Sequence, residues 1–130
     1  MDLALLDPNI VSYALKGHTL APLYAELTRG RPTAVCFMTV AELYEGAYRR
    51  EWDEKRLRKM ETVIGWHTVI PYSQSLAQTW ARIRTERRLQ PIAVDDAWIA
   101  AAALDLGCPL VTHNPGDFRS IDGLNILTLE

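Results

Sequence analysis

Four acidic residues spread along the chain have the chemistry of a metal site: Asp7, Glu42, Asp96 and Asp117. Carboxylates that lie a few ångströms apart repel one another unless a cation lies between them. Sites that offer only oxygen ligands suit hard divalent cations such as Mg²⁺ or Mn²⁺. If the fold brings these four side chains together, the sequence predicts a site for Mg²⁺ or Mn²⁺.

Three of the acids follow predicted strands, and this position decides where they lie. Asp7 comes directly after a short apolar run, Glu42 lies in the first helical turn after a second run, and Asp117 lies in the loop after a third. These runs are residues 3–6, 33–38 and 109–111. In open α/β sheets, ligands bind at the carboxyl ends of the strands. We therefore expect the three acids at one edge of a sheet.

Asp96 reaches the same edge by a different route. It starts a helical segment in which residues 97–104 are apolar without a break, which is typical of a helix buried on most of its surface. Gly107 ends this helix, and the strand at 109–111 follows it. Because this helix and its strand run antiparallel, the polar start of the helix returns to the carboxyl end of the strand.

The rest of the chain alternates between strand and helix patterns, which favours the α/β class. Further strands are expected at residues 67–70 and 124–129, and helices at residues 8–16, 20–28, 39–50, 53–64 and 75–89. Strands separated by helices imply right-handed crossovers and a mostly parallel central sheet that is covered on both faces. With 130 residues, of which 48% are hydrophobic, we expect a single domain over residues 1–130.

The composition sets further bounds on location and partners. A formal net charge of -2 is not that of a uniformly basic nucleic-acid binder, although a local basic surface is compatible with it. The longest uncharged apolar run is far below the roughly 20 residues of a membrane span, and the start of the chain has no basic signal region, so we expect a cytoplasmic protein with no membrane contact. Cys36 and Cys108 lie singly in apolar segments and are expected to be buried, reduced thiols.

Each acid also has a structural role open to it. Asp7 before Pro8 can cap a helix, residues 39–42 fit the capping-box pattern, and Asp95 can cap the helix in whose first turn Asp96 lies. Residues 114–117 can form a simple turn. Capping, however, explains neither Asp117 nor the polar Thr112, His113 and Asn114 that directly follow a buried strand.

Four motifs, in the right order and over essentially the whole chain, resemble those of PIN-domain ribonucleases, in particular the VapC toxins of toxin–antitoxin modules. They are LLDPN at residues 5–9, TVAEL at 39–43, DAWIAA at 96–101 and THNPGDF at 112–118. The resemblance implies a PIN-like three-layer α/β/α sandwich and a site of Asp7, Glu42, Asp96 and Asp117 that binds Mg²⁺ or Mn²⁺ and cleaves RNA. It also implies a small antitoxin protein as partner and a homodimer.

In such a site the metal ions activate a water molecule for attack on the phosphodiester, so no protein nucleophile is needed. Thr112 and Asn114 are expected to orient Asp117 and Asp7 through hydrogen bonds, with Asn9 and Asp95 as further supporting residues. The chain departs from the family at two positions: Pro8 stands where Thr or Ser is usual, and His113 where Arg is common. Asp95 stands where the family often has Asn.

RNA must also be held by its phosphates, for which Lys and Arg are suited. The candidates for RNA contact are His113, Arg119, Arg49 and Arg50, with basic runs at residues 55–59 and 82–88. Interspersed acids make solvated helix faces the commoner interpretation of these runs. The four Trp residues are more typical of core or interface positions than of base stacking.

Two other functions are alternatives to the nuclease. A receiver domain has a similar length and acidic pocket, but it needs an Asp after its third strand and a Lys after its fifth, and neither is present. A PIN-like domain without nuclease activity, in which the acids cap helices and the domain binds a partner, remains the main alternative.

Overall fold

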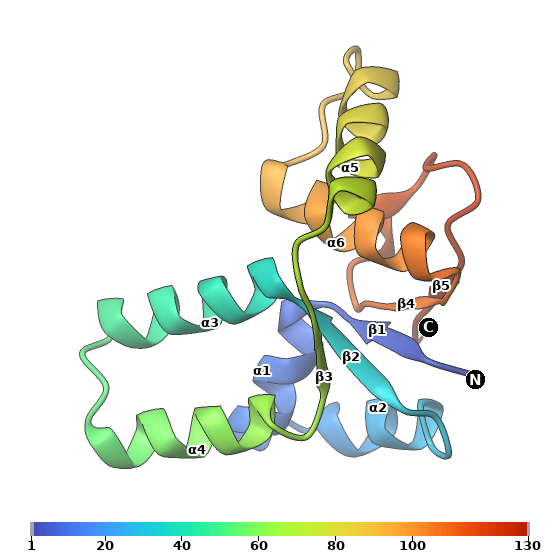
Figure 1. Cartoon of the computed structure of the whole chain (residues 1–130). Helices are drawn as coiled ribbons and strands as arrows, with labels where there is room; N and C mark the ends of the chain where they lie inside the picture. Colours follow the sequence, from blue (N-terminus) through green and yellow to red (C-terminus); the bar gives the residue numbers. More distant parts are fainter. Residues whose placement is uncertain (1, 130) are drawn as a thin grey trace.

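A five-stranded parallel sheet forms the centre of the molecule (Figure 1). The computed structural model describes residues 2–129. The strand order is β3-β2-β1-β4-β5, and each neighbouring pair runs parallel. The strands are β1 (Ala4–Leu6), β2 (Thr33–Cys36), β3 (Thr68–Ile70), β4 (Leu110–Val111) and β5 (Ile126–Leu127). Strands β2 and β3 lie on one side of β1, and β4 and β5 lie on its other side. The connecting helices on these two sides therefore cover opposite faces of the sheet.

Helices cover both faces of this sheet, which confirms the expected α/β/α sandwich. They are α1 (Pro8–Lys16), α2 (Ala21–Leu27), α3 (Phe37–Arg49), α4 (Glu54–Ile64), α5 (Gln74–Glu86) and α6 (Val94–Leu106), with a short 3-10 helix, η1 (Pro115–Phe118). The core beside α5 and α6 is separate from the core beside α1, α2 and α4, and α3 contributes side chains to both. In Figure 1, α3 and α4 form a hairpin that extends away from the sheet.

Alternation along the strands explains the two cores. On β1, Leu5 packs into the core beside α5 and α6, whereas Ala4 and Leu6 pack into the opposite core. On β2, Cys36 and Val35 divide in the same way. Successive side chains of a strand point to opposite faces, so a strand buried on both faces is apolar throughout, as these are. Both cysteines are buried and free, as expected.

Local signals in the sequence account for most of the helix ends. Asp7 caps α1, which then begins with Pro8. The side chain of Asp53 accepts from the backbone N–H of Arg56 at the start of α4, and Ser73 caps α5 in the same way. Gly107 ends α6 in the left-handed conformation, with φ 63°, which glycine adopts without steric cost.

Several predicted boundaries were wrong, among them those of the last strand, which was expected at residues 124–129 and spans only Ile126–Leu127. The second strand was expected to continue to residue 38, but β2 ends at Cys36 and α3 begins at Phe37. The first two residues of this helix, Phe37 and Met38, therefore precede the expected start, and Thr39 lies inside the helix instead of capping it. The helix expected at residues 75–89 ends at Glu86. An apolar run alone does not distinguish the end of a strand from the first turn of a buried helix.

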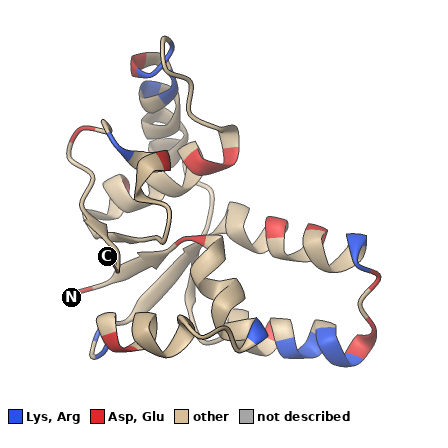
Figure 2. Cartoon of the chain, turned by 180° about the vertical axis from the view of Figure 1, so that it is seen from behind, with Lys and Arg blue, Asp and Glu red and all other residues tan. Residues whose placement is uncertain are grey.

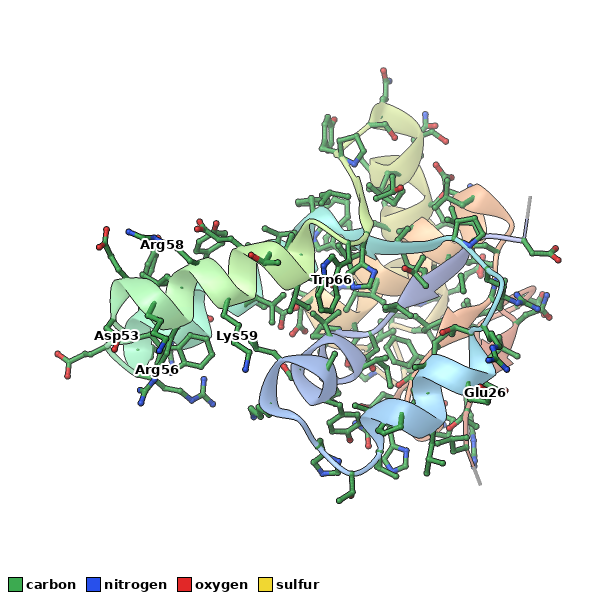
Figure 3. The ribbon with its side chains drawn as sticks, turned by 90° about the horizontal axis from the view of Figure 1, so that it is seen from below. Glu26, Asp53, Arg56, Arg58, Lys59 and Trp66 are labelled. Carbon is green, nitrogen blue, oxygen red and sulfur yellow. The ribbon has the colours of Figure 1, made fainter. Side chains whose placement is uncertain are left out.

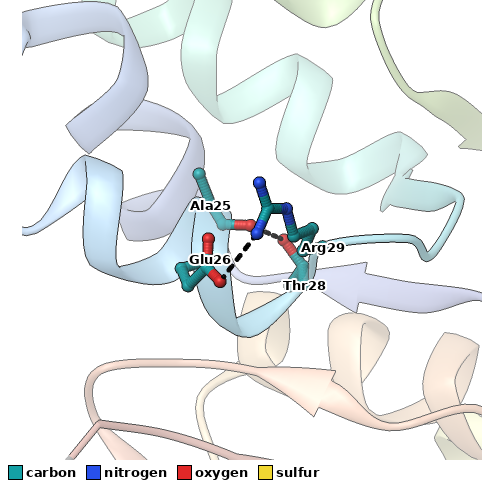
Figure 4. Close-up of polar contacts among 4 residues, drawn as sticks. All are labelled: Ala25, Glu26, Thr28 and Arg29. Atoms are coloured by element: carbon teal, nitrogen blue, oxygen red, sulfur yellow. Dashed lines mark hydrogen bonds and ion pairs between the residues drawn. The ribbon is translucent and has the colours of Figure 1, made fainter.

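The ion pairs on the surface join residues that are close in the sequence. The three ion pairs between charged side chains in the described residues are all exposed and three or four residues apart. Figure 4 shows one of them, in which Arg29 pairs with Glu26 at 3.2 Å at the end of α2. Such pairs contribute about 0.3–0.5 kcal/mol each, so the buried cores, not these contacts, stabilise the fold. Within residues 2–129, no helix is long and apolar enough to span a membrane.

Candidate active site

Asp7 lies where β1 ends and α1 begins, at the carboxyl edge of the sheet. Its backbone N–H donates to the carbonyl of Val111 on the neighbouring β4 at 2.9 Å, which ties the two strand ends together. The side chain is buried, with a relative exposure of 6%. Burial raises the pKa of the Asp7 carboxyl, while a hydrogen bond from Thr112 opposes the rise. A buried carboxylate at the end of two central strands is well placed to contact a ligand.

Thr112 holds the Asp7 side chain in place. This fully buried residue follows β4, and its Oγ1 donates to Oδ2 of Asp7 at 2.6 Å. The same Oγ1 accepts from the backbone N–H of Asn114 at 3.0 Å. The predicted contact of Thr112 with Asp7 is therefore present, and it links the loop after β4 to the end of β1.

Glu42 lies on α3, one turn into the helix, and is half-buried. Its Oε1 is buried and has no hydrogen-bond partner within the described residues. Burial, followed by the nearby carboxyls of Asp95, Asp96 and Asp7, raises the pKa of Glu42 from 4.5 to about 8. Because α3 begins at Phe37, the proposed capping box does not form, and Glu42 has no capping role that would explain its position.

Asp96 enters the site from the first turn of α6, as predicted from the chain order. Burial and the charges of Asp95, Asp117 and Asp7 raise its pKa from 3.8 to about 6. The expected capping role of Asp95 was wrong, because Ala93 is the residue that precedes the helix. Instead, Asp95 lies beside Asp96 in the first turn, and its Oδ1 accepts from the backbone N–H of Asp96 at 3.0 Å.

Asp117 completes the set from η1, in the loop after β4. It is exposed, and its charge contributes to the raised pKa values of both Asp7 and Asp96. The four acids thus come from four separate elements and lie near enough to one another to disfavour ionisation of their neighbours. No Lys or Arg side chain forms an ion pair with any of them in the part of the chain that the structure describes.

The donor chemistry of this cluster fits a hard divalent cation. Every side chain offers carboxylate oxygens, and the unpartnered Oε1 of Glu42 is a ligand atom that no protein group uses. As the side chains lie, no three His, Cys, Asp or Glu residues among residues 2–129 are close enough together to hold one metal ion. Binding by several of these acids therefore requires at least one carboxylate to turn inward.

Two of the predicted supporting residues, Asn9 and Asn114, contact the site through backbone atoms. Asn9 is exposed, and its backbone N–H approaches Oδ1 of Asp7 at 3.5 Å. Asn114 is also exposed and reaches Thr112 through its backbone N–H. No hydrogen bond of the Asn114 side chain to Asp117 or Asp7 is present among the described residues, so its orienting role stays a prediction.

His113 is held by a residue that the sequence patterns did not single out. Its Nδ1 lies 2.6 Å from the hydroxyl of Tyr24, which is almost fully buried on α2. The same hydroxyl accepts from the backbone N–H of Leu129 at 3.3 Å. Tyr24 therefore connects α2, the segment after β4 and the segment after β5. A tyrosine in an otherwise apolar helical stripe was the available signal, but its partner lies 89 residues away.

The arginines predicted to contact RNA lie in different places. Arg50 lines a hollow that also contains Glu42, and its Nη1 donates to the carbonyl of Gly46 at 3.2 Å. Arg49 pairs with Glu45 on the exposed side of α3. Arg119 is exposed and its carbonyl accepts from Arg87 at 3.0 Å. Of these three, Arg50 shares a hollow with Glu42, one of the four acids.

Comparison with known proteins gives one family over nearly the whole chain. The model of the PIN domain family matches residues 4–124. Ribonuclease VapC2 from Haemophilus influenzae is 32% identical over 122 residues, which cover 92% of this chain and 92% of that protein.

Solved structures agree with this match. DNA-bound VapBC from Salmonella typhimurium contains a chain with a TM-score of 0.86 and 27% identity, covering 98% of each chain. A toxin–antitoxin complex from Klebsiella pneumoniae contains one with a TM-score of 0.75 and 28% identity, covering 96% of each chain. The likeness therefore extends over both layers of helices as well as the sheet.

Proposed function

The chain belongs to the PIN-domain family, among the relatives of the VapC ribonucleases, and we propose that it is a divalent-metal-dependent endoribonuclease that acts as the toxin of a toxin–antitoxin pair. The observation that carries this proposal is the accumulation of uncompensated acidic side chains at the carboxyl edge of the sheet. The pKa values of Asp7, Glu42 and Asp96 are all raised. Folding such groups together is unfavourable, and a bound cation removes the cost.

We assign Asp7, Glu42, Asp96 and Asp117 to binding of Mg²⁺ or Mn²⁺, directly or through water. Held by these residues, such an ion would lower the pKa of a coordinated water and would offset the charge that develops on the phosphodiester. Thr112 keeps Oδ2 of Asp7 in one orientation, and the half-buried Glu42 presents Oε1 to the ligand. Asp95 orders the first turn of α6 and adds negative charge, which strengthens attraction for a cation.

RNA cleavage in a purified system tests this proposal. We expect the wild type to cleave RNA with Mn²⁺ or Mg²⁺ present, to lose cleavage with a chelator, and to lose it in Asp96→Asn. Asp96→Asn removes a charge that is unfavourable in the fold, so this variant is expected to remain folded. Glu45→Gln is the matched control, because Glu45 lies on the same helix as Glu42 with an exposed side chain. If the wild type leaves the RNA uncleaved with Mn²⁺ or Mg²⁺ present, the proposed nuclease activity is refuted.

The alternative of a PIN-like domain that binds partners without cleaving RNA has one observation in its favour. Within the described residues no three candidate ligands converge as they lie. Metal titration separates the two functions. A nuclease site predicts that Mn²⁺ raises the melting temperature of the wild type and not that of Asp7→Asn, whereas a domain without a metal site predicts no difference between them.

We further propose a small antitoxin protein as partner, because relatives of similar fold occur in VapBC and toxin–antitoxin complexes. A homodimer is the second assembly we propose. Leu89, in the loop between α5 and α6, and Val94, the first residue of α6, have relative exposures of 89% and 50% and would be covered by a second copy. Light scattering of the purified chain tests the dimer, and Leu89→Ser is expected to weaken it.

A further inference from the structure

A groove leads away from the candidate active site between α1 and the hairpin of α3 and α4. Its inner part is lined by Glu42 and by Pro8, the neighbour of Asp7, and it continues to Lys16, Arg50 and Trp52. A second hollow of about 370 Å³ adjoins it and shares Lys16 and Trp52, and Arg56 and Lys59 of α4 form its far wall. The two hollows together form a path from the acids to the outside of the hairpin.

The outer part of this groove is lined by cations without anionic partners. Lys16, Arg56 and Lys59 form no ion pair within the described residues. Figure 2 shows basic residues gathered along α4 and at the end of α1, and the two helices pack against each other. Four basic side chains thus line the groove, with Glu42 as the acidic residue at its inner end.

Arg58 provides a contrast on the same helix. It pairs with Glu54 at 3.2 Å, and Figure 3 shows it on the opposite side of α4 from Arg56 and Lys59. The basic run at residues 55–59 is therefore divided. Arg56 and Lys59 face the groove, whereas Arg58 lies on the ordinary solvated side with its charge compensated.

Trp52 lies among the unpaired cations. It is half-buried against the core beside α1 and α4, and its backbone N–H donates to the carbonyl of Ala47 at 3.1 Å, which holds the turn after α3. Trp52 lines both hollows. An aromatic face beside positive charges is the combination that holds single-stranded nucleic acid, with bases on the ring and phosphates on the cations.

We propose that this groove is the path of the RNA substrate, which enters as a single strand. Lys16, Arg56 and Lys59 bind its phosphates and one base stacks on Trp52, so that the next segment of the strand reaches the acids at Glu42 and Asp7. This inference rests on the proposed ribonuclease function. The cations offset the repulsion between the acidic cluster and the phosphates, which explains why they lie beside it.

RNA binding without cleavage tests the path. The probe is a fluorescein-labelled single-stranded RNA of about 12 nucleotides, and its anisotropy is measured with the full chain in EDTA. We expect Lys16→Ala and Lys59→Ala each to weaken binding about fivefold and to reduce the slope of log affinity against log salt by about 0.7. Arg58→Ala removes the same charge from the same helix and is expected to change affinity less than twofold, which is the scale of an exposed surface charge.

Trp52 is tested by a pair of smaller apolar substitutions that differ in aromaticity. Trp52→Phe preserves an aromatic face and is expected to bind nearly as the wild type, whereas Trp52→Leu keeps an apolar side chain without stacking and is expected to weaken binding about tenfold. Circular dichroism and urea unfolding of both variants establish that they are folded. Equal losses in Phe and Leu variants, with both folded, would overturn the stacking role.

The outcomes separate this path from the proposed function. If Arg58→Ala weakens binding as much as Lys59→Ala, the groove is not the path. If groove variants bind RNA normally but lose affinity for poly-glutamate, the groove receives an acidic protein and the inference is overturned. If binding depends on the groove but Mn²⁺ supports no cleavage, the proposed nuclease fails and the groove stands only as an RNA-binding surface. If cleavage proceeds with an unchanged KM in Lys59→Ala, the path fails and the nuclease stands.

Discussion

Replacing Glu42 with Gln should stabilise the metal-free protein, and only above acidic pH. The pKa of Glu42 is about 8 in the folded chain against an ordinary value of 4.5. Because the folded-state pKa is the higher of the two, the neutral form is favoured by folding. This contribution is fully present below about pH 4.5 and is lost as the pH rises through about 8. Gln copies the neutral form at every pH.

The size of the effect follows from the same two values. One pKa unit corresponds to about 1.4 kcal/mol, so a rise from 4.5 to about 8 corresponds to about 4–5 kcal/mol for a fully desolvated group. Glu42 is only half-buried and water screens part of the interaction, so we expect about 2 kcal/mol. The free energy of unfolding of Glu42→Gln should exceed that of the wild type by this amount at about pH 8.5, and by almost nothing at about pH 4.

Urea unfolding in EDTA, followed by tryptophan fluorescence at both pH values, measures this difference. Glu45→Gln makes the same chemical change at an exposed position on α3, where the side chain pairs with Arg49 at 3.3 Å. Its effect should stay below about 0.5 kcal/mol at either pH. An equal gain for Glu42→Gln at both pH values, or no gain at about pH 8.5, would refute the assignment of an uncompensated carboxylate to Glu42.

Three further predictions concern the same site and its support. Mn²⁺ at about 100 times its dissociation constant should raise the free energy of unfolding of the wild type by about 2.7 kcal/mol; calorimetry should show no such rise in Asp96→Asn, and a rise there would exclude Asp96 as a ligand. Thr112→Val should lower the free energy of unfolding by about 2–3 kcal/mol, because it leaves Oδ2 of Asp7 without its buried donor. Thr112→Ser keeps the hydroxyl and should lower it by less than about 1 kcal/mol in the same urea experiment. Equal losses in the two variants would refute the role of the hydroxyl. Ala101→Leu inserts volume into a fully buried position of α6 and should lower the free energy of unfolding by at least about 1–3 kcal/mol. Ala25→Leu, on the exposed side of α2, should lower it by almost nothing. The urea midpoints of the two variants measure the difference, and an unchanged midpoint for Ala101→Leu would contradict close packing there.

The arrangement of the acids at one edge was predictable because it depends on chain order alone. In a parallel sheet every strand ends at the same edge, so a residue directly after a strand is placed there without knowledge of packing. Asp7 and Asp117 follow β1 and β4, and Asp96 returns with α6, as expected. The PIN-like α/β/α fold was confirmed by the same parallel topology and by its likeness to solved VapBC structures.

Contacts between distant segments could not be predicted in this way. The capping box at Thr39 and Glu42 is a local pattern, but Phe37 and Met38 pack into the core beside α5 and α6 and draw the start of α3 two residues forward. The residues next to His113 in the sequence give no indication of a buried partner. Tyr24 becomes its partner only because α2 packs beside the segment after β4. The basic groove likewise depends on α1 packing against α4, which no periodicity in either helix specifies.

The Ala-rich helix α6 shows how the fold tolerates an unfavourable site. Residues 97 and 99–103 are at most 1% exposed, and all but Ile99 are alanines, so α6 lies close against both β1 and β2. Alanine has the highest helix propensity and loses no side-chain entropy on burial. Little conformational entropy is therefore lost when this part of the core folds. The stability gained there is available to offset the repulsion that Asp96 meets at the start of the same helix. Asp96 is therefore carried by a securely packed element, so a cation can draw its carboxylate inward without moving the backbone of α6.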